Sequence, residues 1–360
     1  MKNNWQKVKL GDICNVNNRV YSISENWNFA NYLDTGNITK NIINEFLFIN
    51  LKTDKLPSRA RRKVKNGNII YSTVRPNQEH YGYIVSQPKN LLVSTAFAVL
   101  DINPECADSK FIYYLITQTE YTNLLQSVAE QSTTAYPSIK PSDITSLEII
   151  IPPLDGQKKI AEILSALDDK IELNNKINRN LEAQAQAIFK SWFVDFEPFK
   201  NGKFIDSELG KIPEYWQVVK FSEFLKPRIE KINNSTITEY SVTNSGIFKR
   251  DEKFKKRLSG AKTFNKIIYY ADMVFGMSRE ILNWGLMRDQ IGSVSSAYTV
   301  FSVNTELVDL SYLEFFMRYH HEYFKSIIRL ERDKVLIKQF YSINVLLFQI
   351  QMLSLVFLKF

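Results

Sequence analysis

The stretch that decides the fold is Gln157-Lys-Lys-Ile-Ala-Glu-Ile-Leu-Ser-Ala-Leu-Asp-Asp-Lys-Ile-Glu-Leu-Asn-Asn-Lys-Ile-Asn-Arg-Asn-Leu-Glu-Ala-Gln-Ala-Gln-Ala-Ile-Phe-Lys-Ser-Trp192. It holds no proline or glycine, whereas Pro152-Pro153 precede it and Pro198 follows it. Because helix breakers lie only outside the stretch, it predicts one uninterrupted helix with Asp155 as the N-cap. At about 1.5 Å per residue, this helix would be roughly 54 Å long.

Apolar and small side chains recur along this stretch at alternating steps of four and three residues, the a/d spacing of a coiled coil. The seam consists of Ile160, Leu164, Leu167, Ile171, Asn174, Asn178, Leu181, Ala185, Ile188 and Trp192. Charged residues occupy the other faces, so the helix needs a helical partner on one side only. Two asparagines in the seam cost stability but fix the register of pairing. The alternative is a helix packed on an ordinary globular core.

The sequence on the two sides of this helix is repeated. Trp5-Gln-Lys-Val-Lys-Leu-Gly-Asp-Ile13 is echoed by Trp216-Gln-Val-Val-Lys-Phe-Ser-Glu-Phe224, an offset of 211 (216 − 5). Two further pairs of segments repeat at offsets of 201 and 196, namely 109–116 with 310–317 and 146–151 with 342–347. A repeat of this length indicates a duplicated domain, and the slow drift of the offset indicates loops of different length.

Each copy contains two predicted strands followed by a helix. The strands are expected at 67–72 and 93–100 in copy one and at 271–276 and 294–303 in copy two, with helices near 109–126 and 310–328. Strands with helix segregated toward one end predict the α+β class. We therefore expect two similar domains, 1–153 and 198–347, joined by a long central coiled-coil helix within 154–197. Residues 348–360 form an atypical apolar tail.

Composition limits the class of protein and its surroundings. Hydrophobic residues make up 44% of the chain, which supports packed cores, and the net charge of +8 favours an acidic partner such as nucleic acid. A merely basic protein remains the alternative. Cys14 and Cys106 are the only cysteines, so a disulfide framework is not expected and a cytoplasmic location is. No signal peptide is recognised at the start, and the apolar tail is too short for a membrane span.

The central stretch and its flanks resemble a known family. The blocks 151–174 and 178–196, and Leu209-Gly-Lys-Ile-Pro-Glu-Tyr-Trp216, are similar to the central conserved region of type I restriction–modification specificity (S) subunits. The resemblance implies that each copy is a target-recognition domain that reads one half of a split, asymmetric sequence in double-stranded DNA. It also implies that the central helix pairs with a matching distal helix and docks modification (methyltransferase) subunits, which restriction subunits join. A catalytic centre and a cofactor are not expected.

Two basic runs are candidates for DNA contact. Copy one carries Arg59, Arg61, Arg62, Lys63 and Lys65 ahead of its first marked strand. Copy two carries Lys249, Arg250, Lys255, Lys256 and Arg257, which we take to lie in the comparable place. Such side chains neutralise phosphates and release counterions. For either run alone, the alternative is a solvated face.

An arginine follows the first marked strand of each copy, at Arg75 and Arg279. Arginine can bond guanine O6 and N7 in a bidentate manner, and asparagine does the same for adenine, so Arg75, Asn77 and Arg279 are candidates for base readout. The alternative for each arginine is a structural pair with a carboxylate. The polar segment Gln131-Ser-Thr-Thr134 could also approach DNA.

The sequence contains no recognisable catalytic motif. The Pro152-Pro153 pair lacks the polar residue of an amino-methyltransferase motif, and no phosphate-binding loop is found. Asp168-Asp169-Lys170 has the residue types of a nuclease site but lies in mid-helix, and the histidines His80, His320 and His321 make a poor metal set.

Copy two departs from copy one at its end. Residues 348–360 have no Pro-Pro, no charged face and no heptad, so the distal helix of a full S subunit is missing and a truncated or frame-shifted end is expected. The unpaired seam would then be an exposed apolar stripe. We expect it to form a homodimer or to be captured by a modification subunit. Two alternatives stay open: a stand-alone dimeric DNA-binding regulator that uses the same helix, and an enzyme with a hidden nuclease or methyltransferase centre.

Overall fold

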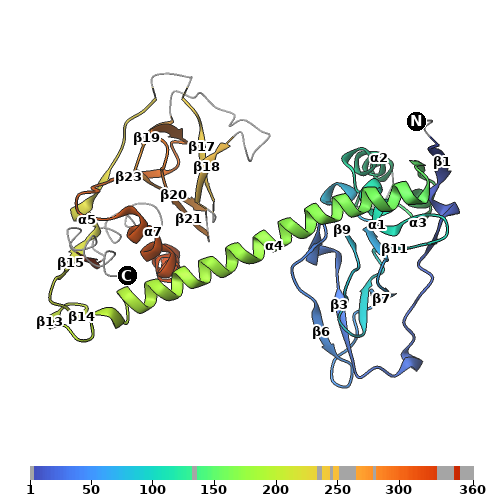
Figure 1. The fold of residues 1–360 in the computed structure, drawn as a ribbon, viewed down its shortest axis with the longest axis horizontal. Coiled ribbons are helices and arrows are strands. Elements are labelled where there is room, and N and C mark those ends of the chain that lie inside the picture. The colour runs from blue at the N-terminus through green and yellow to red at the C-terminus, as the bar shows by residue number, and fades with distance from the viewer. Residues whose placement is uncertain are drawn as a thin grey trace. The chain divides into compact units, whose positions relative to one another are not determined.

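The computed structural model describes residues 4–131, 136–232, 237–243, 246–250, 265–278, 281–330 and 344–348. The chain forms two compact units, Met1–Lys176 (unit 1) and Ile177–Phe360 (unit 2), and their boundary falls inside one helix, α4 (Leu154–Phe193). Each unit combines mostly antiparallel strands with short helices, so the predicted α+β class with a long central helix is confirmed (Figure 1). The predicted atypical tail lies outside the described residues from 349 onward.

Unit 1 is built on two four-stranded sheets with the strand orders β6-β3-β10-β7 and β2-β11-β8-β9. Its strands are β1 (Gln6–Lys9), β2 (Cys14–Val16), β3 (Phe29–Leu33), β4 (Ile38–Thr39), β5 (Ile42–Ile43), β6 (Leu47–Asn50), β7 (Ala60–Lys63), β8 (Ile69–Ser72), β9 (Tyr81–Tyr83), β10 (Leu91–Ser94), β11 (Phe97–Ile102) and β12 (Glu148–Ile151). Apolar side chains from both sheets, including Leu33, Val93, Ile70 and Phe97, form one buried cluster. All four residues of β8 and of β10 are buried, which explains their continuous apolar sequence.

The helices of unit 1 are α1 (Ser109–Ile116), α2 (Thr119–Glu130), α3 (Pro141–Thr145) and the 3₁₀ helices η1 (Leu10–Asp12), η2 (Ile23–Glu25), η3 (Thr35–Asn37) and η4 (Pro76–Gln78). The prediction of one helix over 109–126 is wrong, because α1 ends before Thr117. The Thr117 hydroxyl donates to the Tyr113 carbonyl at 2.8 Å, and Gln118 is extended. A side chain that bonds the preceding turn competes with the helical ladder, so α2 starts anew.

The strand predicted at 93–100 is also two strands. β10 lies in one sheet and β11 lies in the other, so residues 95–96 form a corner between the sheets. The Ala96 carbonyl accepts hydrogen bonds from the backbone N–H and the hydroxyl of Thr73, at 2.7 and 2.8 Å. A continuous apolar run cannot reveal such a corner, because both strands are buried.

Unit 2 repeats one of the two four-stranded sheets, and its other described strands form two-stranded sheets. Its strands are β13 (Phe204–Ser207), β14 (Gly210–Pro213), β15 (Trp216–Lys220), β16 (Leu225–Pro227), β17 (Tyr240–Thr243), β18 (Gly246–Lys249), β19 (Lys266–Tyr269), β20 (Met273–Ser278), β21 (Ile281–Leu286), β22 (Ile291–Val294), β23 (Thr299–Val303) and β24 (Asn344–Phe348). Its helices are η5 (Glu197–Phe199), α5 (Phe221–Phe224), α7 (Leu310–Tyr319) and α8 (His321–Leu330), so the helix predicted at 310–328 is again a pair. The strand predicted at 294–303 likewise becomes β22 and β23.

Strand register confirms the duplication residue by residue. Gln6 faces Ile151 across β1 and β12, and Gln217 faces Leu347 across β15 and β24, at the offsets of 211 and 196 read from the sequence. The sheet order β2-β11-β8-β9 recurs as β16-β23-β20-β21. Because two separated segments keep their mutual register in both copies, the copies share a fold and not only a composition.

The N-terminal part of α4 is fixed to unit 1 by polar contacts. The buried Gln157 side chain accepts a hydrogen bond from the Asp108 N–H and donates one to the Pro152 carbonyl, both at 2.9 Å. Further along, the Tyr114 hydroxyl donates to the Asp168 carboxylate at 2.6 Å. The predicted N-cap is wrong, because α4 begins at Leu154 and Asp155 lies in its first turn, where its charge still suits the helix dipole.

The C-terminal part of α4 is fixed to unit 2 by aromatic packing. Phe189 is buried, and its ring centroid lies 5.7 Å from that of Tyr312 on α7. Phe193 contacts Tyr312 and Trp216, at centroid distances of 5.0 and 5.7 Å. At about 1.5 Å per residue, the 40 residues of α4 extend roughly 60 Å.

Candidate nucleic-acid interface

The corner between β10 and β11 brings two of the predicted DNA contacts together in unit 1. The Thr95 N–H donates to the Arg59 carbonyl at 2.8 Å, and the neighbouring Ala96 carbonyl holds Thr73. The segment that contains Arg59 and the loop that follows β8 therefore meet at one corner. Arg59, Thr95 and Arg75 are all exposed, so this end of unit 1 presents two arginines to solvent.

The loop after β8 is tightly braced. Its 3₁₀ turn η4 lies between Arg75 and Glu79, which adopt the left-handed conformation at φ 48° and 56°. The Arg75 N–H donates to the Pro137 carbonyl at 2.9 Å, and the Asn77 N–H donates to the Gln126 side chain at 3.2 Å. A non-glycine residue in this conformation costs on the order of 1–2 kcal/mol, so the bracing contacts hold the loop in a strained form.

The Arg75 guanidinium lies over the ring of Tyr136, with 4.8 Å from its central carbon to the ring centroid. Among the described residues, no carboxylate lies within 4.0 Å of this guanidinium. The alternative of a structural ion pair therefore finds no support at Arg75 in this part of the chain. Asn77, two residues on, is exposed as well.

The basic residues on and beside β7 differ from Arg75, because two of them pair with carboxylates and a third is partly buried. Lys63 forms an ion pair with Glu25 and Lys65 forms one with Asp101, both at 2.9 Å. Burial lowers the pKa of the Arg62 guanidinium, which lies on the opposite face of the strand from Arg61. Arg59 and Arg61 are the exposed members of this run.

The described part of the basic run of copy two, Lys249 and Arg250, does not occupy the comparable place, and the prediction is wrong for these residues. The counterpart of β7 is β19, which pairs with β22 as β7 pairs with β10. At the offset of 204 that relates Ile69 to Met273, Arg62 corresponds to Lys266 (62 + 204). Lys249 ends β18 instead. Linear spacing could not show which strand these residues join.

Lys249 and Arg250 both have internal contacts in unit 2. Lys249 lies 3.7 Å from the Asp289 carboxylate, and Arg250 donates to the Ser241 hydroxyl at 2.8 Å. The other predicted contacts of copy two, Lys255, Lys256, Arg257 and Arg279, lie outside the described residues, as does most of the segment 131–134.

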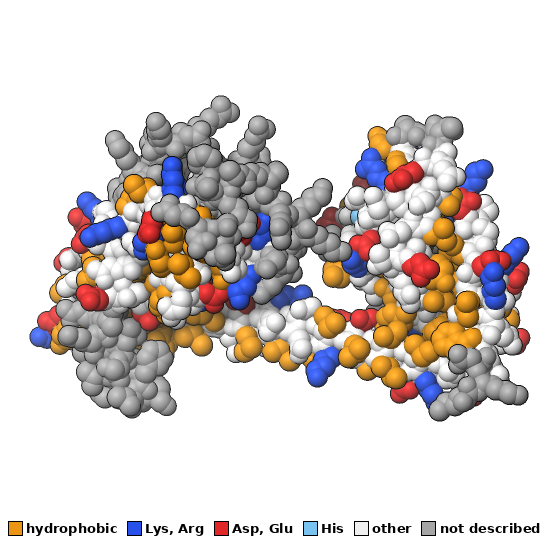
Figure 2. All heavy atoms as spheres, turned by 90° about the horizontal axis from the view of Figure 1, so that it is seen from above, with side chains coloured by type: hydrophobic (Ala, Val, Ile, Leu, Met, Phe, Trp, Pro, Cys, Tyr) orange, Lys and Arg blue, Asp and Glu red, His pale blue; other side chains and the backbone are white. Residues whose placement is uncertain are grey.

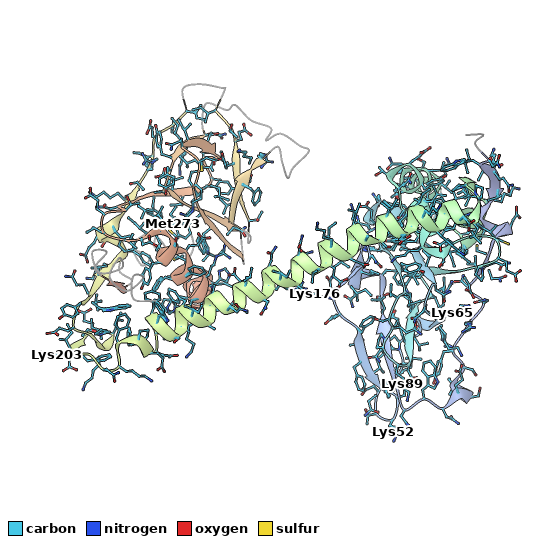
Figure 3. The ribbon with its side chains drawn as sticks, viewed as in Figure 1. Lys52, Lys65, Lys89, Lys176, Lys203 and Met273 are labelled. Carbon is cyan, nitrogen blue, oxygen red and sulfur yellow. The ribbon has the colours of Figure 1, made fainter. Side chains whose placement is uncertain are left out.

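Sequence reasoning missed two exposed lysines of unit 1, Lys52 and Lys89. Figure 3 shows them at one end of the unit, away from Lys65. The Asn31 side chain donates to the Lys89 carbonyl at 2.8 Å, which places Lys89 beside β3. Among the described residues, no carboxylate lies within 4.0 Å of either ammonium group. Neither belongs to a run of consecutive basic residues, so neither gave a signal in the sequence.

The predicted seam of α4 divides into covered and exposed parts. Ile160 and Leu164 are partly buried in unit 1, and Trp192 is partly buried in unit 2. Leu167, Ile171, Leu181 and Ile188 are each more than half exposed, and Asn174 and Asn178 are exposed as well. Figure 2 shows apolar side chains spaced along this helix. Packing on a globular core thus accounts only for the ends of the seam.

A groove of about 800 Å³ lies within unit 2, lined by α4, α7 and β21. Its charged residues pair with one another. Arg288 lies 2.7 Å from Glu314, and Arg318 lies 3.0 Å from Glu314 and 3.4 Å from Glu182. Because these charges are balanced internally, the groove offers no excess charge to an anion.

Asp168 and His80, whose residue types would suit a catalytic site, make hydrogen bonds within the fold. Asp168 accepts the hydrogen bond from Tyr114, and His80 Nδ1 lies 2.6 Å from the Ile38 carbonyl. Burial lowers the pKa of His320. The described residues contain no cluster of three or more potential metal ligands, and none of their helices has the length and apolarity needed to cross a membrane.

Comparison with known proteins identifies the class. A family model described as the type I restriction modification DNA specificity domain matches residues 2–183, just over half of the 360 residues. The chain belongs to this family. A solved structure of a type I restriction–modification system S subunit from M. genitalium has the same fold, with a TM-score of 0.56 over 97% of this chain and 86% of that one at 14% identity.

Two curated relatives carry similar names. The chain is 36% identical over 197 residues to the HindI type I restriction enzyme specificity subunit of Haemophilus influenzae, a match that covers 54% of this chain and 42% of that protein. It is 31% identical over 210 residues to the MjaIX specificity subunit of Methanocaldococcus jannaschii, covering 56% and 46%. The chain therefore matches less than half the length of these relatives.

Proposed function

We propose that this chain is the non-catalytic DNA-recognition subunit of a type I restriction–modification complex. The observation that carries the proposal is the duplication. Two domains whose first and last strands pair in the same register precede and follow one continuous helix along the sequence, in a chain of the specificity family. Two copies of one fold suit two halves of a split DNA target. The proposed domains are 1–153 and 198–347, with 154–197 as the spacer.

The two halves of the target should differ in sequence. Equivalent positions carry different chemistry, such as Arg62 against Lys266 and Asn68 against Asp272. In unit 1 we assign DNA contact first to Arg59, Arg61, Arg75 and Asn77, because these side chains are exposed. To bind a phosphate, Lys63 and Lys65 would have to leave their carboxylate partners, and Arg62 would have to leave its partly buried position. In unit 2 the assignment to Lys249, Arg250, Lys255, Lys256, Arg257 and Arg279 rests on residue type alone.

The exposed stripe of α4 is the proposed docking surface for modification subunits, which in turn would recruit restriction subunits. Leu167, Ile171, Leu181 and Ile188 form an apolar face that no described element covers. Exposed apolar surfaces of this kind mark interaction sites. A modification subunit or a second copy of this chain could bury the stripe.

Genome-wide mapping of methylated positions tests the proposed function. The chain would be co-expressed with a modification subunit, and methylated bases would be read by long-read sequencing. We expect a bipartite, asymmetric motif with a fixed gap that disappears when this chain is omitted. Methylation at a single uninterrupted motif, or methylation that does not depend on the chain, would contradict the proposal.

Sedimentation equilibrium separates the two uses of the helix. If the stripe pairs with itself, the chain alone should associate, and Leu181→Glu should shift it to monomer, whereas the polar-face substitution Lys176→Glu should not. A monomer that binds a modification subunit instead would favour docking alone. A dimer that binds DNA but captures no modification subunit would favour the alternative of a stand-alone regulator.

A further inference from the structure

We infer that Arg75 reads a guanine in the half-site bound by unit 1, and that Tyr136 is the positioning residue that holds the guanidinium for this task. The inference rests on the proposed function, and it adds the identity of one base and of one supporting residue that lies in no predicted contact set.

The geometry leaves the hydrogen-bonding edge of Arg75 open. The Arg75 guanidinium lies over the Tyr136 ring, with its central carbon 4.8 Å from the ring centroid, and this cation–π contact occupies none of its N–H donors with an acceptor atom. Its N–H donors lie in the plane at the edge, in the fork that matches guanine O6 and N7. In the described part of the chain no carboxylate lies within 4.0 Å to occupy that fork.

Stacking also lowers the cost of recognition. A free arginine side chain loses rotamer freedom when it binds, and this loss weakens binding. Arg75 is exposed but already has a preferred plane, because Tyr136 supports it from one side. Pre-organisation of this kind favours base readout, which requires orientation, over phosphate contact, which requires mainly charge.

The backbone supports the same assignment. Arg75 is left-handed at φ 48° and ψ 68°, and residues 73–75 are held against 137–139 by the bonds from Arg75 to Pro137 and from Ile139 to Thr73, at 2.9 and 2.8 Å. These bonds tie the arginine loop to the segment that begins with Tyr136. Strain that is maintained by such bracing is typical of ligand-contacting sites.

The other basic residues of the predicted contact set in unit 1 do not combine exposure with a supporting aromatic ring. Lys63 and Lys65 have carboxylate partners, and Arg62 is partly buried. Arg59 is exposed, but no described aromatic ring supports it. Arg59 is therefore the matched control, because it should contribute to affinity for all sequences alike through phosphate.

The test uses the full chain in complex with its modification subunit and duplexes selected from a random pool. Each guanine of the selected unit 1 half-site is replaced in turn by 7-deazaguanine, which lacks the N7 acceptor and still pairs with cytosine. We expect one replacement to weaken binding roughly tenfold. Arg75→Met, which keeps an unbranched side chain but has no hydrogen-bond donor, should abolish the difference between guanine and 7-deazaguanine at that position. Tyr136→Leu should reduce the difference, and Tyr136→Phe, which keeps the ring, should restore it.

The controls distinguish the two levels of failure. Arg59→Ala should weaken binding to every duplex equally and leave the 7-deazaguanine difference intact. Sequence-specific binding in which Arg75→Met and Tyr136→Leu both retain the full guanine preference would overturn this inference alone. A chain that selects no sequence from the pool would overturn the proposed function and the inference with it. Thermal unfolding of each variant verifies that the fold is unchanged.

Discussion

Trp5 and Trp216 begin the two copies at equivalent positions, yet Trp5 is 46% exposed and Trp216 is 2% exposed. Trp216 is covered by residues at and after the end of α4, with ring centroids of Phe193, Phe196 and Phe199 at 5.7, 5.4 and 5.5 Å. The described residues give Trp5 no such cover. The repeat thus fixes the backbone position of a residue, whereas its neighbours decide how much that residue stabilises the fold.

A second pair of equivalent positions also shares its backbone structure but differs in its side-chain contacts. Asn68 accepts a hydrogen bond from the Lys65 N–H, and its counterpart Asp272 accepts one from the Tyr269 N–H, both at 2.9 Å and at the same offset of 204. The turn is therefore the same in both copies. Its charge is not, because Asn68 bonds the Asp101 carboxylate whereas Asp272 pairs with Arg228.

The largest expected effect concerns the two tryptophans. Trp216→Ala should lower the free energy of unfolding of unit 2 by about 3–5 kcal/mol, because it leaves a cavity among three phenylalanines. Trp5→Ala should cost unit 1 about 1 kcal/mol, since the ring is already half in water. Urea denaturation followed by hydrogen exchange in peptides of each unit measures both. Equal losses in the two variants would show that the aromatic cover does not set the difference.

Next in size is the loss of Arg228. Arg228→Met should cost unit 2 about 3 kcal/mol at pH 7, because it leaves the carboxylate of Asp272 buried, at 1% exposure, without its cation. Burial raises the pKa of Asp272 although Arg228 opposes the rise. A raised pKa means that the native state binds the proton more tightly than the unfolded chain, so the loss should shrink as pH falls toward about 4. Chemical denaturation at several pH values measures it, and a loss independent of pH would contradict the explanation. Lys65→Met, which removes the half-exposed cation beside Asp101 in unit 1, should cost less.

A smaller contrast is expected at two equivalent glycines. A Cβ at Gly285 would lie 2.6 Å from the backbone nitrogen of Ile247, whereas a Cβ at Gly82 would lie 2.5 Å from the terminal methyl of the Ile38 side chain. A side-chain end can move and a strand backbone cannot move cheaply. Gly285→Ala should therefore cost about 2–3 kcal/mol and Gly82→Ala about 1 kcal/mol. Thermal unfolding of the two variants compares them, and a larger loss at Gly82 would reverse the argument.

The smallest effect is the pH dependence of Asp101. Burial opposes its charge, but hydrogen bonds from Lys65, Asn18 and Asn68 outweigh burial and lower the pKa of Asp101. Its stabilisation is present above the unfolded pKa and is lost as pH falls through the folded pKa. Asp101→Asn should cost unit 1 roughly 1 kcal/mol at pH 7 and almost nothing in strong acid. If the unaltered protein and the Asp101→Asn variant still differed by the same free energy of unfolding at pH 2, the ionised carboxylate would not be the source of the stabilisation.

The sequence predicted the elements that rest on long, regular patterns. Thirty-six residues without a breaker indicated α4, and repeated segments indicated two domains of one fold. The errors fell where one residue changes the path of the chain. Thr117 ends α1 through a bond to the preceding turn, and the corner at Thr95 divides a buried run into strands of two sheets. Neither event alters the hydrophobic pattern.

The candidate interface was only partly predictable. Residue type pointed to Arg75 and Arg59, but only the fold brings both to the corner after β10 and places Tyr136 under Arg75. Residue type pointed equally to Lys63 and Lys65, whose carboxylate partners Glu25 and Asp101 lie 38 and 36 positions away in the chain (63 − 25; 101 − 65).

By itself the sequence determined a continuous helix, a duplicated α+β domain and the family, because helix continuity and repeats are encoded by neighbours along the chain. The tertiary structure decided which tryptophan is covered, which strand replaces β7 in unit 2 and which arginine has a free edge. These properties depend on contacts between residues that are far apart in sequence, and loops of unequal length conceal such contacts from any reading of linear spacing.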